Sequence, residues 1–244
     1  MVQIELAGIP IRLDNRFPEL EVLCRDYLTD RVPVISLAVA QEEIEEERSK
    51  QADIFSDGYL ETICLYRKLA LEMLQHNIFL MHASVIDVDG EGYAFLAHSG
   101  TGKTTQTRLW LEYFGNHARV INGDKPLIRA VPAGTGWEFV AFGTPWCGKE
   151  GMGCNASVPL KALFLLERAT VPTCEPADQE YSIDGLFHQL LMPEKPEQMM
   201  RLLDMVDKLV ETVPCYRLRC DMTEDSVMAA YGAATNKYAV ECRE

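Results

Sequence analysis

Residues Tyr93–Trp110 read YAFLAHSGTGKTTQTRLW, and this stretch decides the fold. An apolar strand is followed by a loop with glycines at Gly100 and Gly102, and then by an amphipathic helix that begins near Lys103. This order is typical of a phosphate-binding loop, in which backbone N–H groups and the positive end of a helix dipole surround phosphate oxygens. The pattern G-x-x-x-x-G-K-[ST] is met except at its first position, where Ala97 replaces glycine. The stretch therefore predicts that the protein binds a nucleotide.

The loop residues have predictable roles toward that nucleotide. Lys103 would reach the β- and γ-phosphates, and the hydroxyl of Thr104 would help to hold Mg²⁺, so the expected cofactors are ATP and Mg²⁺. The imidazole of His98 faces either the nucleotide or the solvent. The other residues that we predict to bind the cofactor are Ser99, Gly100, Thr101, Gly102 and Thr105.

The composition is that of a globular protein with an acidic surface. The chain has 244 residues, of which 48% are hydrophobic and 25% are charged, enough for one large or two small domains. Its net charge of −14 disfavours nucleic acid and anionic membranes as partners, because both would repel it. Any nucleotide must then be held by a local pocket of amides, lysine and metal.

Location and redox state follow from what the sequence lacks. Its first residues do not resemble a signal peptide, and no apolar run approaches the about 18 residues of a membrane helix. The eight cysteines include no C-x-x-C pair, so we expect reduced thiols and a cytoplasmic protein. A zinc site built from Cys147, Cys154 and histidines is a minor alternative.

The elements around the loop predict an α/β fold with α+β character. Phe79–Val88 is expected to be a strand that ends at the hairpin signal Asp89-Gly90, and Gly92–Leu96 is the return strand that enters the loop. The further expected strands are Ala118–Asn122, Pro126–Val131, Trp137–Phe142, Val158–Leu166 and Cys215–Cys220. The further expected helices are Lys103–Phe114, Ser182–Met192, Glu197–Val210 and Thr223–Tyr231.

The N-terminal third reads as a separate small unit. Two alternating runs, VQIEL and IPIRL, flank Ala7-Gly8 and predict a hairpin, and Tyr59–Gln75 has the spacing of an amphipathic helix. Gln41–Lys50 is acidic and helix-prone; a solvated helix face or connector is the preferred interpretation, and a surface for a basic partner is the alternative. We place the boundary of this N-terminal unit just after the helix Tyr59–Gln75, near Asn77.

Two groups of residues outside the loop are candidates for chemistry. Asp124 follows a predicted strand, so it should lie at the same sheet edge as Lys103 and serve as metal ligand or base; the alternative is a turn aspartate. Lys125 is either a second phosphate-facing cation or a surface lysine. A second glycine-rich loop contains Trp146, Gly148 and Lys149, and its glycines would let the backbone approach a substrate; the alternative is an ordinary mobile loop.

These motifs resemble a known family. SGTGKTT at Ser99–Thr105 looks like the kinase loop of ATP-dependent phosphoenolpyruvate carboxykinases, and the stretch from His82 through the hairpin and the loop to Asp124 looks like the catalytic domain of HPr kinase/phosphorylase. Similar phosphate-loop kinases accompany some ribosomal-peptide pathways, including lasso-peptide clusters, where they phosphorylate a serine of a precursor. The resemblance implies a carboxykinase-like core of mixed sheet flanked by helices at residues 78–244, preceded by a small α+β subdomain at residues 1–77.

Carried over residue by residue, the resemblance makes Lys103 a phosphate ligand and Thr104 a Mg²⁺ ligand. Asp124 becomes the base for the serine hydroxyl and a metal ligand, and His82 lies near it and tunes or neutralises it. Taken alone, His82 would more often be a core histidine. Lys125 stands where the family has a second aspartate, which bears on the metal arrangement and on any reverse phosphorylase activity. The family's C-terminal substrate-recognition signature has no counterpart, so HPr is not the expected substrate.

The leading functional prediction is an ATP/Mg²⁺-dependent kinase that transfers the γ-phosphoryl group to a hydroxyl, with a serine of a small protein or peptide as acceptor. One alternative is a nucleotide-dependent switch or chaperone for a biosynthetic partner. Another is a small-molecule kinase that acts on free serine or a sugar-like metabolite. Self-association into a homo-oligomer also stays open.

Overall fold

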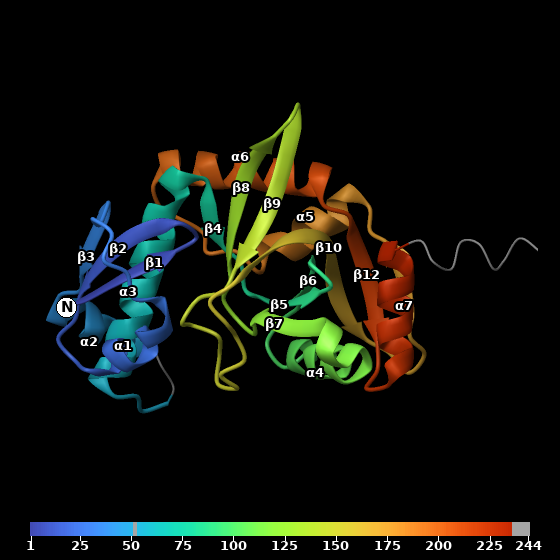
Figure 1. Ribbon diagram of the computed structural model, residues 1–244, viewed down its shortest axis with the longest axis horizontal. Coiled ribbons are helices and arrows are strands. Elements are labelled where there is room, and N and C mark those ends of the chain that lie inside the picture. Colours follow the sequence, from blue (N-terminus) through green and yellow to red (C-terminus); the bar gives the residue numbers. More distant parts are fainter. Residues whose placement is uncertain (51–52, 236–244) are drawn as a thin grey trace, which may run out of the picture.

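The computed structural model describes residues 1–50 and 53–235, which form a mixed α+β fold with two sheets (Figure 1). The smaller sheet has the strand order β1-β2-β3, with β1 and β2 antiparallel and β2 and β3 parallel. Its strands are β1 (Val2–Leu6), β2 (Ile9–Asp14) and β3 (Ile35–Ala38). The helices of this part are α1 (Glu19–Leu23), α2 (Gln41–Lys50) and α3 (Asp57–Met73), with 3-10 turns at Arg25–Tyr27 and Leu74–His76.

The larger sheet has nine strands and is mixed. Seven of them run in the order β4-β8-β9-β10-β6-β5-β7, and β12 pairs with both β10 and β11. The strands are β4 (Ile78–Leu80), β5 (Ala83–Val88), β6 (Glu91–Leu96), β7 (Ala118–Asn122), β8 (Leu127–Ala133), β9 (Gly136–Phe142), β10 (Ser157–Arg168), β11 (Thr173–Pro176) and β12 (Cys215–Cys220). The helices are α4 (Lys103–Phe114), α5 (Gln179–Phe187), α6 (Pro196–Thr212) and α7 (Glu224–Thr235), with a 3-10 turn at Gly115–His117.

Strand β10 joins the two halves of this sheet. Its first residues pair antiparallel with β9, and its later residues pair parallel with β6 on one side and β12 on the other. Alternate residues of β10 face opposite sides: Leu163 and Leu165 pack toward α6, whereas Phe164 packs toward Trp110 of α4. Because helices cover both faces, the strand reads as a continuous apolar run. Figure 1 shows the curled sheet with α6 on one side and α4 on the other.

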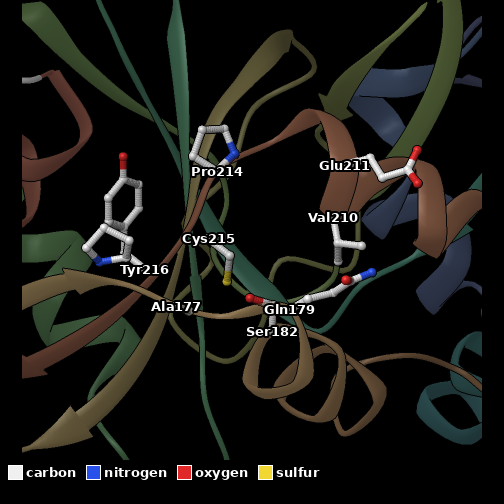
Figure 2. Close-up of a pocket in the computed structure, with 9 residues that line it drawn as sticks. Ala177, Gln179, Ser182, Val210, Glu211, Pro214, Cys215 and Tyr216 are labelled. Atoms are coloured by element: carbon white, nitrogen blue, oxygen red, sulfur yellow. The ribbon is translucent and has the colours of Figure 1, made fainter.

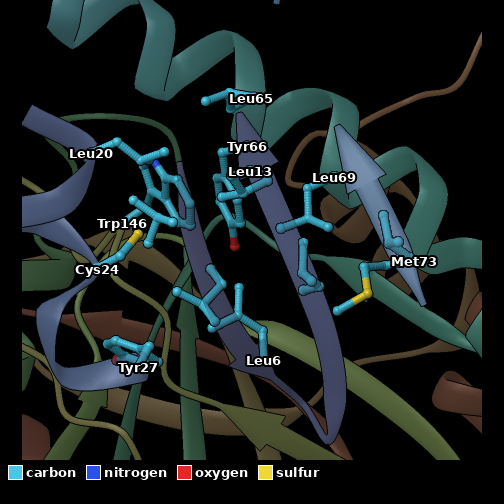
Figure 3. Close-up of a cluster of buried hydrophobic side chains, with 14 of the residues drawn as sticks. Leu6, Leu13, Leu20, Cys24, Tyr27, Leu65, Tyr66, Leu69, Met73 and Trp146 are labelled. Atoms are coloured by element: carbon cyan, nitrogen blue, oxygen red, sulfur yellow. The ribbon is translucent and has the colours of Figure 1, made fainter. Parts of the chain in front are cut away.

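The N-terminal part packs onto the larger sheet through α3. The apolar face of α3 buries Leu65, Leu69 and Met73 against β1 and β2 (Figure 3). Tyr66 of the same helix stacks on Trp146, with 4.1 Å between ring centroids and 6° between ring planes. One hydrophobic cluster therefore contains residues from the first strands and from the loop after β9.

Both predicted hairpins are confirmed by backbone geometry. Ala7 and Gly8 have φ of 50° and 79°, and Asp89 and Gly90 have φ of 51° and 87°. Two successive positive φ values are typical of the tight turns that match strand twist. The second hairpin joins β5 to β6, so the strand that enters the phosphate loop pairs antiparallel with its predecessor, as expected.

Two element predictions need correction, and one strand was not predicted. The single strand expected over Phe79–Val88 is interrupted, because Met81 forms a bridge with Leu190 and the N–H of His82 donates to Gln189 O. The same contacts explain why the helix expected over Ser182–Met192 instead spans Gln179–Phe187. Strand β11 was not expected, since its sequence TCEP is short and polar.

The observed architecture agrees with the general fold class, a mixed sheet flanked by helices. The smaller sheet lies within residues 1–77 and the larger one begins at Ile78, but the division into domains at Asn77 stays a prediction. Among the described residues, no helix combines the length and the apolar character needed to cross a membrane.

Gly143, at the start of the second glycine-rich loop, gives a test of this packing. A Cβ there would lie 1.8 Å from Cys154 O and 2.7 Å from Ile121 O, both backbone atoms. We expect Gly143→Ala to reduce the free energy of unfolding by about 3 kcal/mol, measured by urea denaturation. The control is Gly136→Ala, whose nearest neighbour would be Ala133 O at 3.9 Å, with an effect below about 1 kcal/mol. Equal effects of the two variants would contradict the close approach.

Candidate active site

The phosphate loop connects β6 to α4 and takes a conformation that glycine alone adopts easily. Gly100 has φ of 79° and Gly102 has φ of 137°. A Cβ at either position would meet nothing within 4 Å, so the requirement for glycine comes from the backbone conformation and not from a lack of space. Helix α4 then begins at Lys103 with no side-chain cap on its N-terminus. Its first N–H groups, at the positive end of the helix dipole, are therefore suited to an anion.

Buried hydroxyl groups fix α4 to the sheet. Thr107 Oγ1 donates to Lys103 O at 2.9 Å, and it lies 2.7 Å from Ser84 Oγ on β5. The neighbouring residue, Gln106, donates from Nε2 to Asp221 O at 3.1 Å, which connects α4 to the segment before α7. The start of the helix is thus held to β5, the hairpin partner of the strand that enters the loop.

Lys103 is almost buried and lies beneath its own loop. The residue is 9% exposed, and its Nζ donates to Ala97 O at 2.6 Å. Burial lowers the pKa of Lys103; Asp124 opposes this effect and the charge of Lys125 adds to it. The charges of Asp124 and Lys125 therefore lie close enough to Lys103 to act on its ammonium group.

A buried asparagine shapes the turn that carries Asp124. Asn122, the last residue of β7, accepts the N–H of Asp124 at 2.9 Å and the N–H of Lys125 at 2.7 Å on its Oδ1. Its Nδ2 donates to Thr144 Oγ1 at 3.0 Å. The carbonyl of Lys125 accepts from Thr144 Oγ1 at 2.9 Å and from the hydroxyl of Tyr66 at 2.7 Å. The backbone on both sides of Asp124 is therefore fixed by buried polar groups.

The carboxylate of Asp124 has a basic partner on each oxygen. His82 Nε2 lies 3.1 Å from Oδ1, and Lys125 Nζ donates to Oδ2 at 2.8 Å. Burial alone would raise the pKa of Asp124, but the hydrogen bonds and charges of His82 and Lys125 outweigh it and lower the pKa to about 2. The group is therefore ionised at neutral pH, as a Mg²⁺ ligand must be. The break between β4 and β5 puts His82 at this position.

The phosphate loop and the Asp124 turn face each other across one cleft of about 500 Å³. This volume lies in the usual range for a site that binds a small molecule or cofactor. The predicted site residues that line the cleft are His82, Ser99, Gly100, Gly102, Lys103, Thr104, Thr105, Asp124, Gly148 and Lys149. The other lining residues are Gly123, Lys125, Cys147, Glu150 and Met152.

The structure does not bring every predicted site residue into the cleft. Trp146 is buried against Tyr66, and its Nε1 donates to Thr62 O at 3.1 Å, so the indole is a packing element and does not face a substrate. His98 is exposed outside the lining, with its ring 5.3 Å from the ring of His188. Thr101 also lies outside the lining.

Two residues at the loop were missed by the sequence analysis. Gln189, in the amide orientation that satisfies its neighbours, donates to Ala97 O at 3.0 Å and to His82 O at 3.2 Å. Arg168, at the end of β10, donates to the carbonyls of Gly100 and Thr101. Neither residue carries a local signal, because one follows a helix and the other ends a strand far from the loop in sequence.

The donor set fits Mg²⁺ with a nucleotide better than zinc. The hydroxyl of Thr104 and the carboxylate of Asp124 line the same cleft and are hard oxygen donors, the kind that Mg²⁺ prefers; phosphate oxygens would complete the shell of such an ion. Within residues 1–50 and 53–235, no three or more His, Cys, Asp or Glu side chains gather in a way that could hold a metal. Burial raises the pKa of both Cys147 and Cys154, which disfavours the thiolates that zinc binds.

A second cavity of about 410 Å³ lies away from this site (Figure 2). It is bordered by β11, β12, α5 and α6, and Figure 2 shows Cys215, Ser182 and Gln179 around it. None of the predicted site residues lines it. The predicted site residues that line a cavity therefore belong to the cleft at the phosphate loop and not to this one.

Comparisons with known proteins give one family match. A family model described as "SynChlorMet cassette protein ScmC" matches residues 46–225, which is more than half of the chain. The curated proteins contain no match. Among solved structures, the Hpr(Ser) kinase/phosphatase from Coxiella burnetii is similar over 68% of this chain and 99% of that chain, with 8% identity and a TM-score of 0.32. A similarity at that level supports no conclusion about activity.

The depressed pKa of Asp124 predicts a pH-dependent stability. The folded pKa of about 2 lies below the unfolded value of about 3.9, so the stabilisation is complete above the unfolded pKa and is lost as pH falls through 4 toward 2. We expect wild type to exceed Asp124→Asn by about 2 kcal/mol in free energy of unfolding at pH 7, with a smaller difference at pH 3. Urea denaturation at each pH measures this, and a difference that does not change with pH would contradict it.

Proposed function

The chain belongs to the SynChlorMet cassette protein ScmC family, and from this premise we propose that it is an ATP/Mg²⁺-dependent kinase that phosphorylates a hydroxyl. The proposed acceptor is a serine of a small protein or peptide. The observation that carries the proposal is the cleft itself, where Lys103 and Thr104 of the phosphate loop face the Asp124–His82 pair. Phosphoryl transfer needs these two halves, one to hold the phosphates and one to orient the attacking oxygen.

The binding half would consist of the loop residues Ser99–Thr105. Their backbone N–H groups and the N-terminus of α4 would surround the phosphates, and Lys103 would contribute its charge after leaving Ala97 O. Thr104 and Asp124 would hold Mg²⁺, which neutralises charge on the phosphates when bound. Arg168 and Gln189 would keep the loop in place through its carbonyls.

The chemical half would depend on position more than on basicity. A carboxylate with a pKa of about 2 is a weak general base at neutral pH. The transition state of phosphoryl transfer needs little proton removal, however, and depends mainly on alignment and charge stabilisation. Asp124 would therefore accept a hydrogen bond from the acceptor hydroxyl and fix its direction of attack, while His82 holds the carboxylate.

The acceptor would enter beside the second glycine-rich loop. Gly148 and Lys149 are exposed and line the cleft next to Asp124. A cleft open on this side could admit a peptide segment. The family name describes a cassette protein, which supports an acceptor or partner from the same cassette.

A second candidate function is a nucleotide-dependent switch for a biosynthetic partner. The observation in its favour is that both oxygens of Asp124 already have partners, His82 and Lys125. Such a protein would bind ATP and change its affinity for the partner without phosphorylating it. A small-molecule kinase would use the same cleft with a free serine-like acceptor.

The proposed function predicts separate effects for the two halves of the site. The assay uses γ-labelled ATP with either the peptides of the same cassette or free serine as acceptor. Asp124→Asn should reduce transfer about 100-fold or more, because the acceptor hydroxyl loses the carboxylate that accepts its hydrogen bond. The affinity for ATP measured without Mg²⁺ should change less than about threefold, because the loop residues hold the phosphates. Lys103→Ala should weaken ATP binding and transfer together. Asp204→Asn, an exposed residue of α6 paired with Lys208, is the matched control.

Three outcomes distinguish the candidates. Label on a peptide supports the proposal, and label on free serine alone points to a small-molecule kinase. Label on no acceptor, with nucleotide-dependent binding of a partner, favours the switch. Transfer that is unchanged in Asp124→Asn would remove Asp124 from the mechanism.

A further inference from the structure

The backbone of Lys125 is fixed by hydrogen bonds to buried side chains, whereas its own side chain is partly exposed. Its N–H donates to Asn122 Oδ1, and its carbonyl accepts from Tyr66 and Thr144. The side chain is 44% exposed and lines the cleft, where Nζ donates to Asp124 Oδ2 at 2.8 Å. The ammonium group thus enters the cleft from a fixed backbone position, on a side chain that is partly exposed to solvent.

The charges around the cleft differ from those of the molecule as a whole. The chain carries a net charge of −14, yet Lys103, Lys125 and Lys149 all line this one cavity. Of the two acidic residues in the lining, Glu150 is paired with Arg108 of α4. The remaining acidic residue of the lining is Asp124, whose partners His82 and Lys125 both lie within the cleft. Three lysines therefore share the cleft with a single carboxylate that is not paired with a residue outside it. A local excess of cations is expected where a polyanion binds.

Asp124 does not need Lys125 in order to be paired. His82 Nε2 lies beside its other oxygen at 3.1 Å. Ion pairs with an exposed partner contribute little to stability, because water competes for both charges. If the Lys125 ammonium moved from the Asp124 carboxylate to a phosphate oxygen, the free energy lost with the ion pair would therefore be small.

We propose that Lys125 is a nucleotide-binding residue that pairs with Asp124 in the free protein and contacts the terminal phosphate of a nucleoside triphosphate. This inference rests on the proposed function and adds to it. Lys125 stands at the position where the kinases that this chain resembles carry a second aspartate. A lysine there would supply part of the positive charge that neutralises the phosphates. Its movement would free one oxygen of Asp124 for the metal or the acceptor.

The test is a comparison of triphosphate and diphosphate affinity. The 244-residue wild type, Lys125→Met and Lys125→Arg are titrated with fluorescent mant-ATP and mant-ADP in the presence of Mg²⁺. We expect Lys125→Met to weaken mant-ATP binding about tenfold or more, the range of a charged hydrogen bond, and to change mant-ADP binding less than about threefold. Lys125→Arg keeps the cation and should retain most of the preference for the triphosphate.

The matched control is Lys161→Met, which removes the same charge from an exposed ion pair with Glu91 outside the cleft. It should leave both affinities close to wild type. Equal losses of mant-ATP and mant-ADP affinity in Lys125→Met, or no loss of either, would overturn the assignment while leaving the proposed function intact. If wild type binds neither nucleotide, the proposed function fails and the role of Lys125 fails with it.

Discussion

The side-chain amide of Asn122 is the buried group on which the candidate site depends. Its oxygen accepts hydrogen bonds from the backbone N–H groups of Asp124 and Lys125, just after β7, and its nitrogen donates to Thr144. These bonds hold the turn and connect it to the loop after β9. Without these bonds the residue would be fully buried with unsatisfied polar atoms, a costly state. Satisfying them fixes the direction of Asp124 and the start of Lys125. The rest of the cleft is arranged around this turn, since His82 and the phosphate loop meet Asp124 from the opposite side.

The same turn connects the cleft to the N-terminal part of the chain. Tyr66 on α3 donates to Lys125 O and stacks on Trp146, and Trp146 donates back to Thr62 on α3. Figure 3 shows Tyr66 beside Trp146 in this cluster. Through its bond to Lys125 O, Tyr66, a residue from the first third of the sequence, supports the candidate catalytic turn directly. A change in the position of α3 would move the backbone beside Asp124. This coupling is a physical reason to treat both parts as one working unit, whichever domain division applies.

Sequence reasoning predicted the features that depend on local order. The loop, its helix and the Asp89-Gly90 hairpin follow from residues that are neighbours in the chain, and the Asp124 turn follows from strand order. What it missed depends on contacts between distant segments. Trp146 was predicted to line a substrate site because its neighbours in sequence do not indicate that it stacks on Tyr66. The break in the strand at His82 depends on contacts with Gln189 and Leu190, which are about a hundred residues away. Arg168 is separated from its loop by more than sixty residues, so no spacing could reveal it.

The measurement that tests the central claim most directly is a crystal structure of the 244-residue protein with Mg²⁺ and a non-hydrolysable ATP analogue. The account predicts phosphates surrounded by the Ser99–Thr105 backbone, with Lys103 and Thr104 as ligands and Asp124 beside the terminal phosphate. An analogue bound elsewhere, for instance in the cavity next to Ser182 and Cys215, would contradict it. So would a nucleotide in the loop whose terminal phosphate points away from Asp124.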